Sequence, residues 1–445
     1  MLLVSASAID SLNLAFLNLS MLPRKRSFLL PGLLALFIVS CGRGDEERFD
    51  GTSTPIVTQE TTPAAVIEAT AIPVPDKPTY STPLVSTASP TAEGISASEE
   101  VDIFFNSPEY GVHAFLWWRP NIAERDLALI EDMDFGWVKQ SFAWRDIESI
   151  EKGKYDWWRS DQIVNATEDA GLNLLVRIDR QPFWSQEPGA DLKENIPPAD
   201  YNDFGDFCGA LAERYVGRID AYQVWNEPNL SREWGDRPPD PAEYTELLKI
   251  CYKAIKEVDP GAIVISAGLA PTGTGLPIAI PDTEFLQGMY DAGAAEYFDV
   301  LGLNAPGYKA PPETPPEEGE SNPDFGGGRW FVFRHVEDMR EIMVDNGDGA
   351  KQAAILELGW TTDEVHPEYA WHAVNEEEQA DYLVRAYTYA TENWQPWIGL
   401  VTAIYIADFD WTPEEDEQWW WSITLPDGTP RPAYFALRDM EKSGP

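Results

Sequence analysis

Residues 221–229 read Ala-Tyr-Gln-Val-Trp-Asn-Glu-Pro-Asn, an apolar run that ends abruptly in polar residues and a proline. The run predicts a short buried strand over 221–224, and the proline after Glu227 marks its end. In a barrel of parallel strands, active-site side chains lie at the carboxyl ends of the strands. A carboxylate there is a candidate acid or base, so the pattern favours a functional role for Glu227 over a solvated turn residue.

A second stretch, residues 353–360, repeats this pattern as Ala-Ala-Ile-Leu-Glu-Leu-Gly-Trp. Glu357 interrupts an apolar strand end, where an unpaired charge is costly, so it either serves chemistry or pairs with a core Lys or Arg. Glu227 and Glu357 lie 130 residues apart, which is three strand–helix units of about 43 residues each. The spacing predicts that they end the fourth and seventh strands of one barrel and share its rim.

From residue 101 onward, short apolar runs alternate with amphipathic helical stretches. The predicted strands are 110–115, 137–138, 173–178, 221–224, 263–267, 300–303, 354–356 and 401–406. Predicted helices fill the gaps and include 160–170, 200–215, 241–258, 333–346 and 377–394. Eight strand–helix repeats predict fold class α/β, with a (β/α)₈ TIM barrel rather than two domains.

The composition excludes several functional classes. The 445 residues carry 32 Lys and Arg against 75 Asp and Glu, a net charge of −43. Such a charge repels nucleic acid and anionic membrane surfaces, so neither is expected as the main partner. The 4 His and 3 Cys have no metal-ligand spacing, and we expect neither a metal nor another cofactor. All 18 Trp lie between 117 and 421, and their flat faces suit sugar stacking as well as core packing.

The N-terminal region has the features of an export signal. Basic residues at 24–26 precede an apolar run, 28–39, that is too short for a comfortable membrane span. The run ends in Ile-Val-Ser-Cys41, which resembles a bacterial lipobox; an ordinary signal peptide with a chance cysteine is the alternative. We expect lipid attachment at Cys41, with the protein anchored in the cell envelope and facing outside the cytoplasm.

The next segment predicts a linker. Residues 51–100 contain 10 Thr, 6 Ser and 7 Pro and a single aromatic residue, too little apolar surface to offset the entropy of ordering. The expected organisation is therefore an upstream extension and signal peptide at 1–40, a disordered linker at 41–104 and the barrel at 105–445. Oligomeric state is not indicated.

The two glutamate motifs, taken together, resemble clan A glycoside hydrolases, the retaining (β/α)₈ enzymes that include cellulase-like and β-xylosidase-like families. Two further stretches are similar to these families: 136–148 with 153–157, and 425–434. The resemblance spans residues 105–440. It implies that Glu227 is the general acid/base, that Glu357 is the nucleophile, and that Asn226 binds the sugar 2-hydroxyl.

At two positions the chain departs from the family pattern. Lys139 ends the second strand where many clan members have an Arg, and it supplies a charge without the planar fork of a guanidinium. After the sixth strand, Asn304 replaces a His and Tyr308 is displaced from its usual place. The resemblance still implies substrate contacts for all three residues. The sequence leaves open whether Tyr308 contacts Glu357.

Several other rim residues are candidate substrate contacts. His113 ends the first strand and Trp184 follows the third, and each is either a subsite wall or a packed rim residue. Trp360 closes the Glu357 motif, and the resemblance implies a sugar-supporting role for Trp411 after the eighth strand. The tryptophans 419–421 suit a sugar platform or lid better than a core. The Pro-, Glu- and Gly-rich stretch 310–328 is either a cleft wall or a solvated insertion.

Two functions fit these observations. The first is hydrolysis of β-glycosidic bonds in an extracellular oligo- or polysaccharide by a retaining, double-displacement mechanism. The second is glycan binding without catalysis on the same barrel. Two carboxylates on one rim favour the enzyme, because a binding protein has no need for both. Cys208 and Cys251 fall on successive predicted helices, and we expect them to pack as small apolar residues, with a disulfide possible outside the cytoplasm but not predicted.

Overall fold

The computed structural model describes residues 101–189 and 191–442. Its strands form one parallel sheet in the order β5-β4-β3-β2-β1-β8-β7-β6, and parallel bridges Ile265↔Val300 and Leu269↔Leu303 link its two edges. The strands are β1 (Glu109–His113), β2 (Trp137–Ala143), β3 (Asn173–Asp179), β4 (Ala221–Val224), β5 (Ile263–Ile265), β6 (Leu301–Pro306), β7 (Ala353–Gly359) and β8 (Ile398–Ala403). The predicted (β/α)₈ barrel is confirmed.

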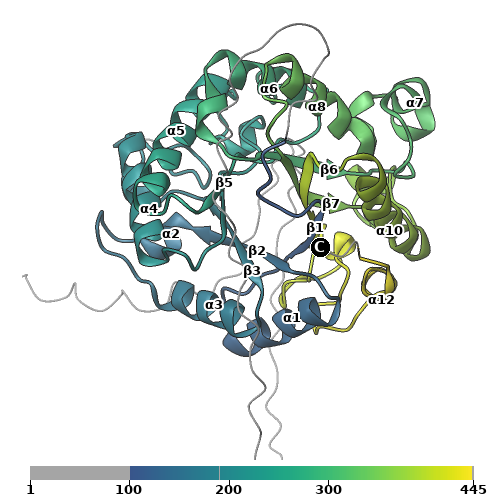
Figure 1. Ribbon diagram of the computed structural model, residues 1–445, viewed down its shortest axis with the longest axis horizontal. Coiled ribbons are helices and arrows are strands. Elements are labelled where there is room, and N and C mark those ends of the chain that lie inside the picture. Colours follow the sequence, from purple (N-terminus) through teal and green to yellow (C-terminus); the bar gives the residue numbers. More distant parts are fainter. Residues whose placement is uncertain (1–100, 190, 443–445) are drawn as a thin grey trace, which may run out of the picture. The chain divides into compact units, whose positions relative to one another are not determined.

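Helices surround the barrel, and the longer ones follow one another around it in chain order (Figure 1). They are α1 (Pro120–Asp132), α2 (Trp144–Ile147), α3 (Trp158–Asp169), α4 (Tyr201–Arg214), α5 (Pro241–Val258), α6 (Asp282–Asp291), α7 (Pro316–Ser321), α8 (Val336–Asp345), α9 (Pro367–Ala370), α10 (Glu376–Asn393), α11 (Gln418–Trp421) and α12 (Pro432–Asp439). The Pro-rich stretch 310–328 holds the short helix α7, so it is folded in part.

Local sequence explains where the long helices begin. Asp240 caps α5, because its side chain accepts from the backbone N–H groups of Ala242 and Glu243, and Pro241 occupies the first helical position. Asn375 and Glu378 form a reciprocal capping box at the start of α10. Both helices then bury one apolar stripe against the barrel.

Two apolar clusters make up the core. The larger lies between strands and helices, and the smaller fills the barrel interior, where Trp137, Leu175, Ala221, Ile265 and Leu356 are among its members. Strand β2 is longer than the predicted 137–138. The prediction ended the strand at Val138 because polar residues follow it. Those residues continue the strand because one of them, Lys139, lies on the barrel's inner face together with Trp137.

The structure contains a disulfide between Cys208 of α4 and Cys251 of α5, so our expectation of two unpaired cysteines was wrong. The reason is close helix packing. A Cβ added to Gly205 would lie 2.4 Å from Ile250, so only glycine permits this approach. The Cα atoms of the two cysteines are consequently 5.4 Å apart, within the normal range for a disulfide.

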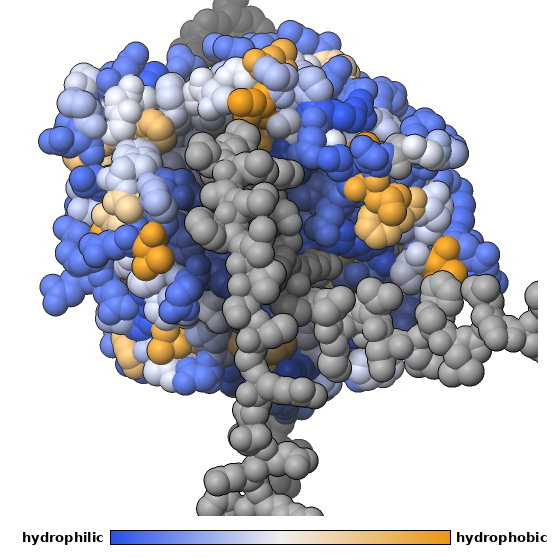
Figure 2. All heavy atoms as spheres, turned by 180° about the vertical axis from the view of Figure 1, so that it is seen from behind, coloured by the Kyte–Doolittle hydropathy of each residue, from blue (hydrophilic) through white to orange (hydrophobic). Residues whose placement is uncertain are grey.

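The molecular surface matches the acidic composition. On the face shown in Figure 2, hydrophilic residues dominate and apolar residues form small separate patches. Within 101–189 and 191–442, no helix is long and apolar enough to cross a membrane. The expected signal segment, Cys41 and most of the expected linker lie outside the described residues.

Candidate active site

The inner faces of neighbouring strands change from apolar to charged along their length. On β2, Lys139 stands two residues beyond Trp137, and on β3, Arg177 stands two residues beyond Leu175. Because strand side chains alternate between faces, these cations lie above the apolar filling of the barrel. The polar layer therefore occupies the carboxyl end of the barrel, where active sites of this fold lie.

A β-bulge places Glu357 in this layer. Ile355 of β7 pairs with Leu303, but the next pair along is Glu357 with Asn304, so Leu356 is an extra residue. Leu356 faces the barrel interior, and regular alternation would turn Glu357 outward. The bulge re-aims the carboxylate into the barrel mouth.

The backbone around Glu227 is held in an unusual conformation. Trp225 has φ +72° and Glu227 has φ +44°, both in the left-handed region that bulky residues rarely adopt. The Glu227 N–H donates to the carbonyl of Gly268 at 3.1 Å, which ties the turn to the neighbouring loop. Strain of this kind collects at functional sites, where the surroundings enforce it.

Asn304 joins the two glutamates. Its Nδ2 donates to Glu227 Oε1 at 3.1 Å and to Glu357 Oε2 at 3.4 Å. These two oxygens therefore lie no further apart than the sum of the bonds, 6.5 Å. A Cβ at Gly268 would come within 2.1 Å of Asn304 Oδ1, so glycine is required there.

Two cations face Glu357. Lys139 Nζ lies 3.2 Å and Arg177 Nη1 lies 3.7 Å from Glu357 Oε1. Burial lowers the pKa of Lys139 to about 8, although the charge of Glu357 opposes this shift. Arg177 also pairs with Asp179 at 2.9 Å, and Asp179 accepts from Ser141 at 3.0 Å. Two positive charges therefore lie against one oxygen of the Glu357 carboxylate.

A second pair of charges lies beside Glu227, on the loop after β4. Arg232 Nη2 donates to Glu227 Oε2 at 3.0 Å, and Arg232 Nε lies 3.5 Å from Glu233 Oε1. Asn195 donates to the other oxygen of Glu233 at 2.7 Å. Burial and the neighbouring charge of Glu227 raise the pKa of Glu233 to about 7.

Asn226 and His113 lie on the same rim. The side-chain oxygen of Asn226 accepts from Gln223 at 3.3 Å, which leaves its Nδ2 as the donor for other groups. His113 is buried, and neither ring nitrogen has a hydrogen-bond partner among the described residues. Burial, with the charges of Lys139 and Arg177, lowers the pKa of His113 well below its ordinary value.

The predicted aromatic contacts are dispersed. Trp411 is half-buried and packs on Phe115 and Tyr405. Burial and the charge of Glu357 raise the pKa of Tyr405. The half-buried Trp184 donates to the Glu148 carbonyl at 2.7 Å and packs edge-on against Trp144.

Tyr308 and Trp360 do not contact the glutamates in the structure. The Tyr308 hydroxyl donates to the Pro271 carbonyl at 3.3 Å, and not to Glu357, the contact that the sequence left open. Trp360 is fully buried, and its Nε1 donates to the Ala310 carbonyl at 3.0 Å. A fully buried ring offers no face to a sugar, so Trp360 is placed as a core residue.

Sequence reasoning missed four charged residues of the site. Arg177 and Asp179 had a usable signal, because they interrupt an apolar strand, as Glu357 does. Arg232 and Glu233 gave none, since a charged loop residue after a strand is ordinary.

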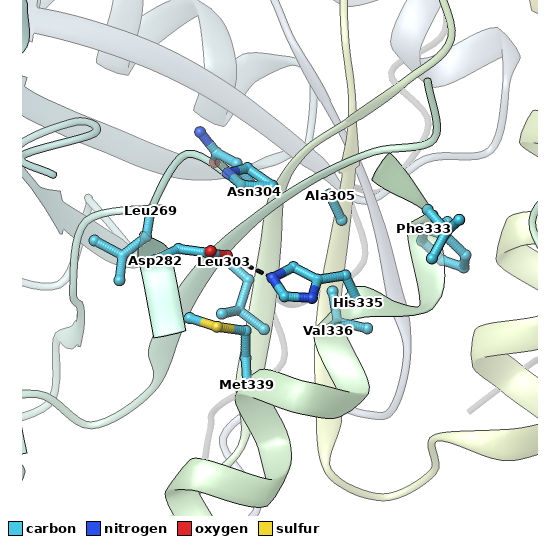
Figure 3. A pocket seen from close by; sticks show the side chains of 11 residues that line it. Leu269, Asp282, Leu303, Asn304, Ala305, Phe333, His335, Val336 and Met339 are labelled. Carbon is cyan, nitrogen blue, oxygen red and sulfur yellow. Dashed lines mark hydrogen bonds and ion pairs between the residues drawn. The ribbon is translucent and has the colours of Figure 1, made fainter. Parts of the chain in front are cut away.

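A small cavity lies beneath Asn304, lined by residues of β6, α6, α8 and the adjoining loops (Figure 3). The space open to the centre of a water molecule is about 10 Å³, enough for about one water. It is too small for a substrate. Within the described residues, no group of three or more His, Cys, Asp and Glu side chains is placed to hold a metal ion.

In this cavity wall, His335 lies between two carboxylates. Its Nε2 is 2.8 Å from Asp282 and its Nδ1 is 2.9 Å from Asp338. Burial alone would lower the pKa of His335, but the two carboxylates raise it to about 9. The ring is therefore a charged structural link between α6 and α8 (Figure 3).

Comparison with known proteins finds short similarity in sequence and many similar folds. No family model matches the chain. Over 76 residues the chain is 36% identical to a beta-xylosidase from Geobacillus stearothermophilus, a match that covers 15% of each chain. The matched part is thus a small fraction of that relative.

Solved structures of glycoside hydrolases share the fold. A family 39 glycoside hydrolase from Bacteroides cellulosilyticus WH2 has a TM-score of 0.56 and 21% identity over 75% of this chain and 63% of its own. A glucosidase from Croceicoccus marinus has a TM-score of 0.54 and 14% identity over 76% and 68%. A family 5, subfamily 18 enzyme from Streptomyces cattleya, in complex with GlcNAc, has a TM-score of 0.54 and 14% identity over 75% and 80%. At these identities the comparisons show a shared (β/α)₈ fold.

Proposed function

We propose that the protein is a retaining glycoside hydrolase that cleaves β-glycosidic bonds of an extracellular oligo- or polysaccharide. The observation that carries the proposal is the bridge from Asn304 to both glutamates, which keeps the two bridged carboxyl oxygens within 6.5 Å of each other. Retaining enzymes place their carboxyl groups about 5 to 5.5 Å apart, and inverting enzymes need a wider gap to admit a water. The fold shared with glycoside hydrolases agrees with this proposal.

In the first step, Glu357 attacks the anomeric carbon while Glu227 gives its proton to the departing glycosidic oxygen. Lys139 and Arg177 contact Glu357 Oε1 and orient the carboxylate. The product of this step is a covalent glycosyl ester on Glu357. In the second step, Glu227 takes a proton from a water molecule whose oxygen bonds to the same carbon, and the ester bond breaks.

Substrate contacts follow from the rim. The donor of Asn226 suits the sugar 2-hydroxyl. Both ring nitrogens of His113 are buried, so we assign it no direct hydrogen bond to the sugar. Trp411 and Tyr405 supply an aromatic surface on the β8 side. We assign no direct sugar contact to Trp360.

Sugar release from a panel of polysaccharides and nitrophenyl β-glycosides tests the proposal. The panel includes xylosides, because of the short match to a beta-xylosidase, beside glucosides, galactosides and mannosides. The comparison protein is a Glu227→Gln/Glu357→Gln double variant shown to be folded by circular dichroism. Release by the parent alone supports hydrolysis. Glycan binding by both proteins without release would instead indicate a binding barrel.

We further propose that Cys41 carries a lipid that anchors the protein in the cell envelope, on the basis of the lipobox-like sequence. In a bacterial expression host, radiolabelled palmitate should enter the parent and not a Cys41→Ser variant. Equal labelling of both proteins would contradict the anchor.

A further inference from the structure

The two carboxyl oxygens of Glu227 have different neighbours. Oε1 accepts from Asn304 on the inner side, and Oε2 accepts from Arg232 on the loop side at 3.0 Å. An acid must deliver its proton from an oxygen that the leaving group can reach. A guanidinium has only donors, so it fits an ionised oxygen and not one that carries a proton.

Arg232 has the freedom to leave this position. Its side chain is 68% exposed, whereas that of Glu227 is 15% exposed. It belongs to the short turn Ser231–Glu233, and its Nε already lies 3.5 Å from Glu233. Glu233 is fixed by Asn195, so it offers a stationary second carboxylate.

We propose that Arg232 is a positioning residue that pairs with Glu227 while this carboxylate is ionised and shifts to Glu233 when Glu227 carries its proton. The inference rests on the proposed glycosidase function. In the first chemical step the proton leaves Glu227 Oε2 for the glycosidic oxygen, and Arg232 returns to the new carboxylate. In the second step the proton of the attacking water returns to Glu227, and Arg232 moves to Glu233.

Other charged and titratable groups also lie around Glu227 and contribute to the pH dependence of its ionisation. They come from every element packed around it: Lys139 on β2, Glu357 on β7, Tyr308 after β6, Tyr405 after β8, and Arg232 and Glu233 on its own loop. Among them only Arg232 is largely exposed and bonded to the outer oxygen. The variants that isolate its role therefore change Arg232 and its alternative partner alone.

The test compares pH profiles of kcat/KM for three variants, on a nitrophenyl glycoside that the parent hydrolyses. Arg232→Gln should move the upper limb of the profile to higher pH by about half a unit, because a cation that favours ionised Glu227 is lost. Glu233→Gln should move it to lower pH, because Arg232 then has a single partner and a like charge is gone. Arg237→Gln is the control, since Arg237 is on the same loop and pairs with Glu243 of α5.

A second measurement does not need catalysis. The Glu227 carboxyl is followed by carbon-13 NMR in the purified protein and assigned by its absence in Glu227→Gln. The pH midpoint of its titration should move to higher pH in Arg232→Gln and to lower pH in Glu233→Gln. No movement, or the same direction in both, would overturn the role of Arg232. Absence of sugar release by the parent from every substrate of the panel would instead overturn the glycosidase proposal, while the NMR result would still report on the pairing.

Discussion

Lys139 Nζ lies 3.2 Å from Glu357 Oε1, and the lysine side chain is entirely buried. The same Nζ donates to the Leu356 carbonyl at 3.1 Å, at the bulge that turns Glu357 into the site. Lys139 thus holds both the carboxylate and the neighbouring backbone of the proposed nucleophile in place. A cation held in this way needs no reorganisation during the reaction.

Replacing this lysine should impair catalysis strongly. In Lys139→Met, we expect kcat/KM to fall about 100-fold or more, because Glu357 loses its nearest cation. Lys193→Met is the matched control, since Lys193 is an exposed rim residue that pairs with Asp236. Steady-state kinetics on the best substrate of the panel measures the effect. Equal rates for Lys139→Met and the parent would contradict the assignment.

The same residue should set an alkaline limit. Because burial lowers the pKa of Lys139 to about 8, the ammonium loses its proton as pH rises through this value. Dinitrophenyl glycosides, whose leaving group needs no proton, should therefore still be cleaved more slowly above about pH 8. A Lys139→Arg variant should keep its remaining activity there, since a guanidinium stays charged. An unchanged alkaline limb in that variant would argue against Lys139 as its origin.

Asn304 should be sensitive to the residue beneath it. In Gly268→Ala, the new Cβ would lie 2.1 Å from Asn304 Oδ1, so the amide must shift and its bonds to both glutamates must lengthen. Small displacements of this kind cost about 100-fold in rate. We expect a lower kcat, with KM changed less. Gly275→Ala serves as the control, because a Cβ at that loop position meets no atom within 4 Å.

The buried His335 link should make stability depend on pH. Asp282 and Asp338 raise the pKa of His335 to about 9 against the effect of burial, while the unfolded value is about 6.5. Its contribution, up to about 3 kcal/mol, is therefore complete below about pH 6.5 and is lost as pH rises through 9. Urea unfolding of the parent and His335→Gln should show a difference that shrinks across this range. A constant difference would mean that the ring is not charged.

The disulfide should stabilise the barrel. It closes a segment of 43 residues between α4 and α5, and loss of such a link costs about 2 to 4 kcal/mol. The Cys208→Ala/Cys251→Ala variant should unfold at a lower urea concentration than the parent. Reductant should destabilise the parent and leave the variant unchanged. If the parent proved insensitive to reductant, the cysteines would be unpaired in solution.

Much of the fold was predictable because apolar runs and amphipathic helices alternate eight times along the chain. The two glutamates were predictable because a charge at an apolar strand end is conspicuous. The strand containing Lys139 was predicted too short, since its polar residues broke the apolar run that marks a strand. The disulfide depends on helix spacing set by Gly205, which no local pattern reveals.

The details of the site were less accessible. The bulge at Leu356 and the bridge by Asn304 depend on how strands β6 and β7 align, which is a property of the sheet and not of either segment. Trp360 belongs to a motif at the rim, yet its ring turns into the core beside Gly307, where a Cβ would clash with it. Side-chain direction at a strand end is decided by packing.

The most direct test of the central claim is to trap the intermediate on Glu357. The protein is incubated with a 2,4-dinitrophenyl 2-deoxy-2-fluoro-β-glycoside of its preferred sugar, and the digested product is analysed by mass spectrometry. The proposed mechanism predicts one glycosyl group on the peptide that contains Glu357, and none in Glu357→Gln. Turnover of the ordinary substrate by Glu357→Gln at the parent's rate, with no labelled peptide in either protein, would contradict it.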